Sequence, residues 1–142
     1  MTDVRRVLFL CTHNSARSQM AEAFLNKLGG GRFQAFSAGT EARGLHPLSI
    51  QAMAEAGIDI SLQRSKTVDV FADQQFDLMI TVCDEANEAC PYFPNARVRW
   101  HWSLPDPSAA TGDDDERFAA FVAVRDAIRD RIERELLSPR VG

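Results

Sequence analysis

The chain has 142 residues, of which 45% are hydrophobic and 25% charged, and its formal net charge at pH 7 is −4. This length and composition are typical of a globular domain, and we expect one domain over residues 1–142. The negative charge argues against nucleic-acid binding, and no apolar run approaches the ~18 residues of a membrane span. Because no targeting segment is evident, we expect a cytoplasmic protein that contacts neither nucleic acid nor membrane.

Two apolar runs alternate with two helical patterns in the first half of the chain. Residues 7–10 predict a buried strand, and apolar residues at helical spacing predict a helix over about 15–28. A second strand is expected over 32–39, and a second helix over 46–57 with Pro47 in its first turn.

The second half continues the alternation. Residues 76–83 predict a third strand that ends at Cys83, and residues 96–104 predict an edge strand. Residues 113–137 predict a long helix with an acidic start. The buried stripe of this helix is expected to contain Phe118, Phe121, Val122, Val124, Ile128, Ile132 and Leu136. Strands that alternate with helices indicate an α/β fold with a parallel sheet covered on both faces.

Three chemically notable segments fall at the carboxyl ends of the predicted strands. Cys11 ends the first strand, Cys83 ends the third, and Asp106 lies in a loop after the last. Since sites in parallel sheets lie beyond the carboxyl ends of the strands, we expect these residues to meet at one edge.

The segment after the first strand has the pattern expected of an oxyanion-binding loop. Between Cys11 and Arg17 it holds five mostly small residues, namely Thr12, His13, Asn14, Ser15 and Ala16. Such a loop at a helix start can direct successive backbone N–H groups inward and form an anion-binding nest. Asn14 is the member that best tolerates a left-handed conformation.

The residues at the two ends of this loop suggest which reaction it supports. An ordinary thiol is mostly protonated at neutral pH, but a helix N-terminus stabilises the thiolate, so Cys11 is a candidate nucleophile. Arg17 provides a planar fork that matches two oxygens of a tetrahedral oxyanion, and Ser18 can donate a hydrogen bond to the sulfur. We therefore predict that Cys11 attacks a bound phosphate-like centre.

Asp106 lies between two prolines in the sequence LPDP. The prolines stiffen the loop, and a stiff carboxyl beside the nest could donate a proton to a leaving group. Asp-Pro turns are common, however, and the spacing alone does not favour a catalytic role.

Cys83 and Cys90 are seven positions apart. They are either two unrelated thiols or a redox pair; a zinc pair lacks further ligands, so no metal site is expected. If the intervening segment were helical, the Cα atoms would be roughly 10 Å apart, whereas a disulfide requires less than about 7 Å. A Cys83–Cys90 disulfide would therefore require the segment to unwind.

The sequence CTHNSARS resembles the C-x5-R-S phosphate loop of the low-molecular-weight protein tyrosine phosphatase family, and VLFLC, SQMAEAF, FSAGT and AGIDIS are also similar. The likeness covers nearly the whole chain. It implies a flavodoxin-like three-layer α/β sandwich, with a four-stranded parallel sheet flanked by helices, and makes Asp106 the general acid. In tyrosine phosphatases aromatic residues follow this Asp-Pro pair, whereas here SAATGDDD follows, so we expect no pocket for phosphotyrosine.

One branch of that family, the thioredoxin-coupled arsenate reductases, has two downstream cysteines arranged like Cys83 and Cys90. The resemblance implies that Cys11 attacks arsenate, that Cys83 then attacks Cys11, and that Cys90 attacks Cys83. Thioredoxin would reduce the final disulfide, and phosphate or sulfate would bind as analogues of arsenate. We expect a monomer, and we expect the reaction to need no cofactor.

Some members of this branch use a potassium site near the loop, with an acidic residue where this chain has Lys66. Asn14, Glu22 and Ser37 match the family at this place. One hypothesis is that the Lys66 ammonium replaces the cation and pairs with Glu22; a solvated lysine is an equal alternative.

Three other functions stay open. A phosphatase would use Cys11, Arg17 and Asp106, and Cys83 and Cys90 would have no role in catalysis. A thiol sensor or arsenite-binding module would use the thiols without turnover. A reductase could also take its electrons from glutathione or mycothiol, although two resolving cysteines argue against a small thiol.

Overall fold

The computed structural model describes residues 4–84 and 92–138. Four strands form one parallel sheet in the order β2-β1-β3-β4. They are β1 (Arg5–Cys11), β2 (Phe33–Gly39), β3 (Phe76–Thr81) and β4 (Ala96–His101). The helical elements are α1 (Arg17–Leu28), α2 (Pro47–Glu55), α3 (Asp114–Ile132), the 3-10 turns η1 (Val68–Phe71) and η2 (Pro107–Ala109), and the π-helical turn η3 (Glu133–Leu137).

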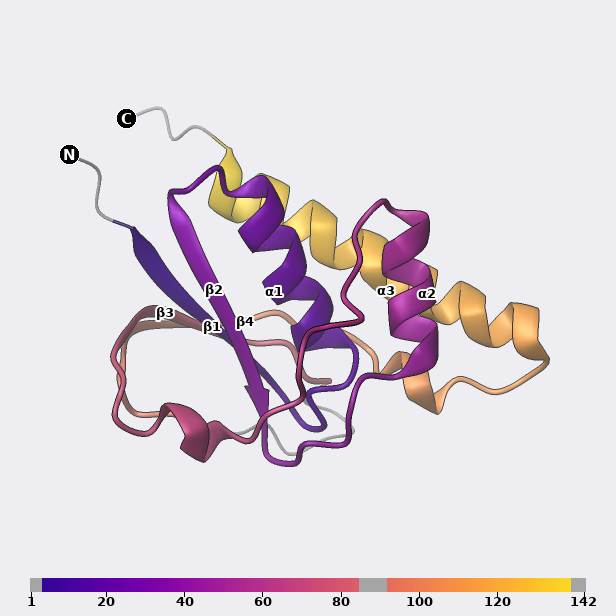
Figure 1. Ribbon diagram of the computed structural model, residues 1–142, viewed down its shortest axis with the longest axis horizontal. Helices are drawn as coiled ribbons and strands as arrows, with labels where there is room; N and C mark the ends of the chain where they lie inside the picture. Colours follow the sequence, from indigo (N-terminus) through magenta and orange to yellow (C-terminus); the bar gives the residue numbers. More distant parts are fainter. Residues whose placement is uncertain (1–3, 85–91, 139–142) are drawn as a thin grey trace.

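The central strand β1 divides the core into two clusters. Val7, Phe9 and Cys11 belong to a cluster shared with α1, α2 and α3, which lie together on one face of the sheet (Figure 1). Leu8 and Leu10 point to the opposite face, where the second cluster also contains Ala38, Phe71, Phe76, Met79 and Phe93. Both faces are thus covered, as expected for a parallel sheet, and the predicted fold class is confirmed.

Helix termini follow the sequence signals closely. In α2 the His46 side chain accepts a hydrogen bond from the Leu48 N–H at the N-cap, and Pro47 occupies the first turn. In α3, Asp113 and Glu116 form a capping box that satisfies exposed N–H groups. The α-helical part of the last helix ends at Ile132 rather than continuing to residue 137, because its final turn is π-helical.

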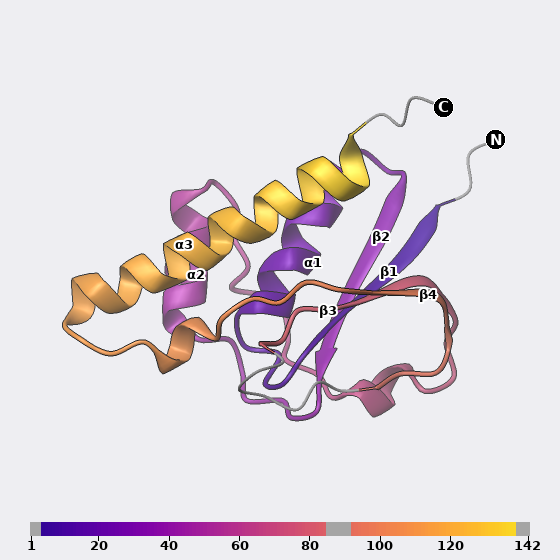
Figure 2. The ribbon, with the colours of Figure 1, turned by 180° about the vertical axis from the view of Figure 1, so that it is seen from behind.

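The carboxyl edge of the sheet is where the site forms. The turn from β1 into α1 lies at the lower edge in Figures 1 and 2, away from the marked chain ends. The ladder of β3 ends at Thr81, two residues before Cys83, but the Val82 N–H still donates to the Leu10 carbonyl at 2.8 Å. Within the described ranges, no helix is both long and apolar enough to span a membrane.

Candidate active site

The Cys11 sulfur lies at the floor of the loop between β1 and α1. Cys11 is the last residue of β1, is a free thiol, and is only 1% exposed. The Asn14 N–H donates to its sulfur at 3.2 Å, and the Ser18 hydroxyl oxygen lies 2.8 Å from that sulfur. The backbone N–H and the hydroxyl thus both lie within hydrogen-bond distance of the sulfur.

Asn14 organises the loop from within. Its φ of 49° is the one positive value among the described non-glycine residues, as expected for this position. Its side-chain carbonyl accepts from the Lys66 N–H at 2.7 Å, and its Nδ2 donates to the Ser18 hydroxyl at 2.7 Å. Because the Ser18 oxygen already accepts this bond, its own proton is available to the Cys11 sulfur.

Neighbouring segments hold the carbonyls of the loop outward. The Thr12 carbonyl accepts from the Glu41 N–H at 2.9 Å, and the Ser15 carbonyl accepts from the His46 N–H at 3.0 Å. In a trans peptide the following N–H points the opposite way, so these contacts turn loop amides inward. The predicted loop Cys11–Ser18 is therefore shaped as an anion nest. His13, also in the loop, has its Nε2 3.8 Å from Glu41 Oε2.

Arg17 and Asp106 lie close to each other in the structure. Arg17 is 2% exposed, and its Nη1 donates to the Leu104 carbonyl at 3.1 Å, which anchors the guanidinium. Its Nη2 lies 4.0 Å from Asp106 Oδ2. The other Asp106 oxygen, Oδ1, accepts from the Ser108 N–H at 2.9 Å and hydroxyl at 2.7 Å. Ser108 thus holds the carboxyl in place with one oxygen facing the guanidinium.

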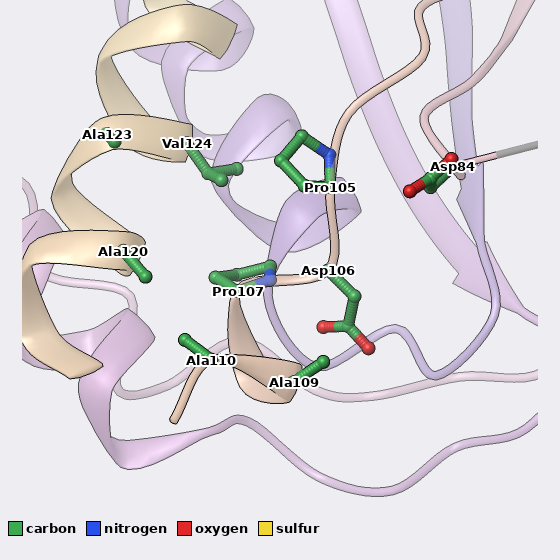
Figure 3. A pocket seen from close by; sticks show the side chains of 9 residues that line it. All are labelled: Asp84, Pro105, Asp106, Pro107, Ala109, Ala110, Ala120, Ala123 and Val124. Carbon is green, nitrogen blue, oxygen red and sulfur yellow. The ribbon is translucent and has the colours of Figure 1, made fainter. Parts of the chain in front are cut away.

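A hollow of about 550 Å³ begins beside Asp106 (Figure 3). Its lining consists mainly of small and apolar side chains from the segment 105–110 and from α3. They are Asp84, Pro105, Asp106, Pro107, Ala109, Ala110, Ala120, Ala123 and Val124. Among the described residues, those that line this hollow include no aromatic side chain.

Cys83 lies next to the strand that carries Cys11. It is fully buried, and its sulfur lies 4.0 Å from the carbonyl oxygen of Leu10. Leu10 immediately precedes Cys11, so the structure brings these two cysteines to neighbouring positions at the carboxyl edge of the sheet. The third predicted cysteine, Cys90, lies outside the described residues.

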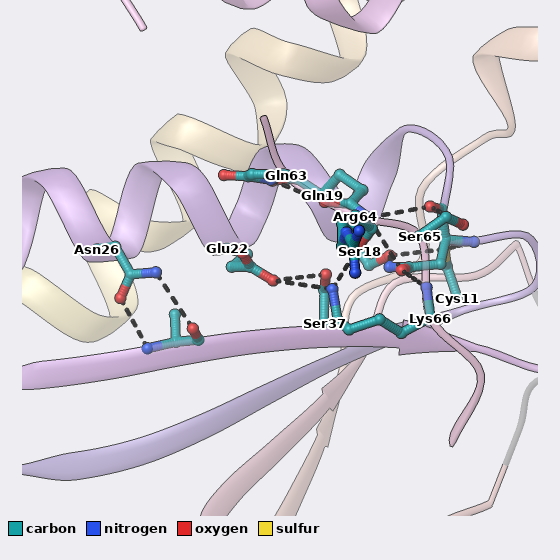
Figure 4. A network of polar contacts seen from close by, with 12 residues as sticks. Cys11, Ser18, Gln19, Glu22, Asn26, Ser37, Gln63, Arg64, Ser65 and Lys66 are labelled. Carbon is teal, nitrogen blue, oxygen red and sulfur yellow. Dashed lines mark hydrogen bonds and ion pairs between the residues drawn. The ribbon is translucent and has the colours of Figure 1, made fainter. Parts of the chain in front are cut away.

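An ion pair lies behind the nest, between α1 and the sheet (Figure 4). Lys66 Nζ is 3.8 Å from Glu22 Oε1, and the Ser37 hydroxyl donates to the same carboxyl oxygen at 2.7 Å. Burial raises the pKa of Glu22 and lowers the pKa of Lys66, and each charge partly opposes the other's shift. Of the two alternatives for Lys66, the structure shows the pairing with Glu22. Among residues 4–84 and 92–138, no cluster of three or more His, Cys, Asp or Glu could hold a metal ion.

Sequence reasoning missed two residues that support the nest. A Cβ on Gly39 would lie 2.7 Å from the Thr12 carbonyl oxygen and 2.9 Å from the Asn14 nitrogen, so glycine allows the loop to approach β2. Gln19 is fully buried, and its amide donates to Asn14 Oδ1 at 2.9 Å. The sequence did contain a signal for each residue. Gly39 is a glycine at the end of a strand, and Gln19 is a polar residue in the first turn of an otherwise apolar helix face.

Comparison with known proteins places this geometry in a family. The family model for low molecular weight phosphotyrosine protein phosphatase matches residues 6–138. An arsenate reductase of Halalkalibacterium halodurans is 46% identical over 127 residues, which cover 89% of this chain and 91% of that protein.

Solved structures agree. An arsenate reductase in the phosphate binding state has a TM-score of 0.74 and 34% identity, covering 92% of this chain and 95% of that chain. A thioredoxin-dependent arsenate reductase of Corynebacterium glutamicum has a TM-score of 0.64 and 30% identity, covering 96% of this chain and 64% of that chain. With a family model spanning nearly all of its residues, this chain belongs to the low molecular weight phosphotyrosine protein phosphatase family.

Proposed function

We propose that the protein reduces arsenate to arsenite through Cys11, Cys83 and Cys90, with electrons from thioredoxin. The observation that carries the proposal is the position of Cys83, whose sulfur lies 4.0 Å from the Leu10 carbonyl, one residue from the nucleophile. Simple ester hydrolysis has no use for a second buried thiol at this place. The arsenate reductases among its relatives and structural neighbours support arsenate as the substrate.

The nest and Arg17 bind the oxygens of arsenate, which has the shape and charge of phosphate. The Cys11 thiolate then attacks arsenic(V), and a sulfur–arsenic bond forms as an oxygen leaves. Asp106, held by Ser108 with one oxygen toward Arg17, donates the proton with which that oxygen departs as water.

Electrons move in the next step. The Cys83 thiolate attacks the Cys11 sulfur; a Cys11–Cys83 disulfide forms, the sulfur–arsenic bond breaks, and its electron pair reduces arsenic(V) to arsenic(III). Cys90 then attacks Cys83, which restores the Cys11 thiolate and moves the disulfide to Cys83–Cys90. Two thiols are oxidised for each arsenate reduced, so the two-electron balance closes without a cofactor.

A protein dithiol is the expected reductant for the Cys83–Cys90 disulfide, and the neighbour from Corynebacterium glutamicum is described as thioredoxin-dependent. A single small thiol such as glutathione would not need two resolving cysteines. We place the reaction in the reducing environment of the cytoplasm, and assign it to one monomeric domain over residues 1–142.

Phosphatase activity is the second candidate function, because the same geometry serves it. Cys11 at the floor of the nest, Arg17 beside the oxyanion and Asp106 on the leaving-group side are the groups that hydrolysis of a phosphomonoester requires. We expect this activity to be residual.

The test is to map disulfides by mass spectrometry after the reduced protein meets arsenate without reductant. We expect one arsenite per protein, a Cys83–Cys90 disulfide and a free Cys11. Three thiols that remain reduced would refute the proposal. With thioredoxin, its reductase and NADPH, steady consumption of NADPH would separate an enzyme from a sensor or an arsenite-binding module, which would give no turnover.

A further inference from the structure

Two glutamine side chains form a chain of amides behind the nest (Figure 4). Gln19, in the first turn of α1, is fully buried. Its Nε2 donates to the Arg64 carbonyl at 2.8 Å and to Asn14 Oδ1 at 2.9 Å, and its Oε1 accepts from Gln63 Nε2 at 2.7 Å. Gln63 lies on a loop 44 residues away in sequence.

Backbone groups fix the direction of every amide in this chain. Asn14 must present its oxygen to the Lys66 N–H, which can only donate. Gln19 must present its nitrogen to the Arg64 carbonyl, which can only accept. Gln63 must likewise present its nitrogen to the Gln19 backbone carbonyl, 3.2 Å away.

Directed in this way, the hydrogen bonds all run toward the sulfur. Gln63 donates to Gln19, Gln19 to Asn14, and Asn14 donates through Nδ2 to the Ser18 hydroxyl. The Ser18 oxygen accepts from Asn14 and lies 2.8 Å from the Cys11 sulfur, so the Ser18 hydroxyl can donate its proton to a Cys11 thiolate, which can only accept. Each donor in such a chain polarises the next.

We propose that Gln19 and Gln63 are positioning residues, which hold Asn14 and Ser18 in the orientation that keeps a donor on the Cys11 sulfur. The inference rests on the proposed role of Cys11 as the nucleophile. Neither glutamine touches the substrate. Their effect on reactivity passes through Asn14, whose amide would otherwise be held by the Lys66 N–H and the Ser18 hydroxyl alone.

The experiment measures the reactivity of Cys11 directly. In a Cys83→Ser, Cys90→Ser background Cys11 is the only cysteine, and its rate of alkylation by iodoacetamide is followed from acid to alkaline pH. Gln63→Met and Gln19→Met are expected to slow alkylation about threefold to tenfold near pH 6, the effect of one weakened hydrogen bond to a charged group. At alkaline pH, where every thiol is ionised, the rates should equal that of the parent.

Gln51→Met is the matched control, because Gln51 is an exposed residue of α2. Its alkylation profile should coincide with that of the parent. Gln63 is half-buried on a loop, so Gln63→Met keeps the test valid even if Gln19→Met fails to fold. If the alkylation profile of Gln63→Met were identical to that of the parent, the proposed positioning role of Gln19 and Gln63 would be overturned and the proposed function would stand. If Cys11 of the parent were unreactive near pH 6, the proposed function itself would be overturned.

Discussion

The Cys83 sulfur lies 4.0 Å from the carbonyl oxygen of Leu10, the residue that positions Cys11 at the end of β1. The sulfur that would form a disulfide with Cys11 is thus buried near Cys11 at the carboxyl edge of the sheet. In the proposed mechanism, Cys83 takes no part in hydrolysis and is indispensable in reduction.

Replacing Cys83 should therefore separate the two chemistries. In Cys83→Ser, arsenate turnover with thioredoxin should fall below detection, because serine cannot form the disulfide. Hydrolysis of an aryl phosphate should persist, since the nest, Arg17 and Asp106 are unchanged. The two activities are measured on one preparation, and Cys83→Ala serves as a second variant. Reductase activity that survives in both variants would contradict the proposed transfer of oxidation from Cys11 to Cys83.

Asp106→Asn tests the proposed role of Asp106 as the proton donor. Asparagine keeps the shape but cannot transfer a proton, so hydrolysis of phenyl phosphate, with its poor leaving group, should slow about 100-fold or more. Hydrolysis of p-nitrophenyl phosphate should slow less, because its leaving group needs less protonation. Ser108→Ala, which removes one hydrogen bond to Asp106 Oδ1, should have a smaller effect of the same kind. Equal losses on both esters in Asp106→Asn would argue against general acid catalysis.

Gly39→Ala should distort the nest. The added Cβ would meet backbone atoms at 2.7 Å from the Thr12 oxygen and 2.9 Å from the Asn14 nitrogen, and neither can move without moving the loop. We expect kcat/KM for arsenate to fall at least about tenfold. Gly57→Ala is the control: its φ of 84° makes alanine unfavourable by about 1 kcal/mol, yet nothing lies within 4 Å. It should lower stability and spare kcat/KM.

Glu22 should make stability depend on pH. Burial raises its pKa, even though Ser37 and Lys66 lower it in part, so the folded protein retains a proton that the unfolded chain has released. Stability contributed by Glu22 therefore falls as pH rises from the ordinary glutamate pKa to the raised one. Relative to the parent, Glu22→Gln should gain in free energy of unfolding between pH 4 and pH 7, as measured by urea denaturation. A stability difference between Glu22→Gln and the parent that stays constant from pH 4 to pH 7 would contradict a raised pKa, and one that narrows would indicate a lowered pKa.

Lys66 gives a prediction about ions. Its ammonium lies 3.8 Å from Glu22 and donates to the Arg64 carbonyl at 2.6 Å, so a positive charge already occupies this place. Exchanging sodium for potassium at constant ionic strength should leave arsenate kcat/KM unchanged. A steep rise with potassium would mean that Lys66 does not replace a bound cation.

Much of the fold could be predicted because its signals are local. The apolar run of β1, the proline at the start of α2 and the acidic start of α3 each identified an element from a few adjacent residues. The π-helical turn over 133–137 was not predicted, since its residues favour a continuous α-helix as well. Helix α1 begins at Arg17, two residues later than predicted, because Ser15 and Ala16 belong to the nest.

The site was predictable where one segment carries it. Cys11, Asn14, Arg17 and Ser18 lie within eight positions, and the spacing suffices to suggest an anion nest. The supports come from far along the chain: the Leu104 carbonyl that anchors Arg17 is 87 residues from it, and Gln63 is 44 residues from Gln19. Contacts of this range depend on how the elements pack, which no local pattern encodes.

The alternation of side chains along β1 fixes the face of the sheet on which the Cys11 sulfur lies. Val7, Phe9 and Cys11 face the helices, whereas Leu8 and Leu10 face the other cluster, and a shift of one residue would exchange the two sets. The sulfur therefore cannot be displaced to the wrong side without dismantling both clusters. Heat inactivation should in consequence coincide with cooperative melting of the whole domain.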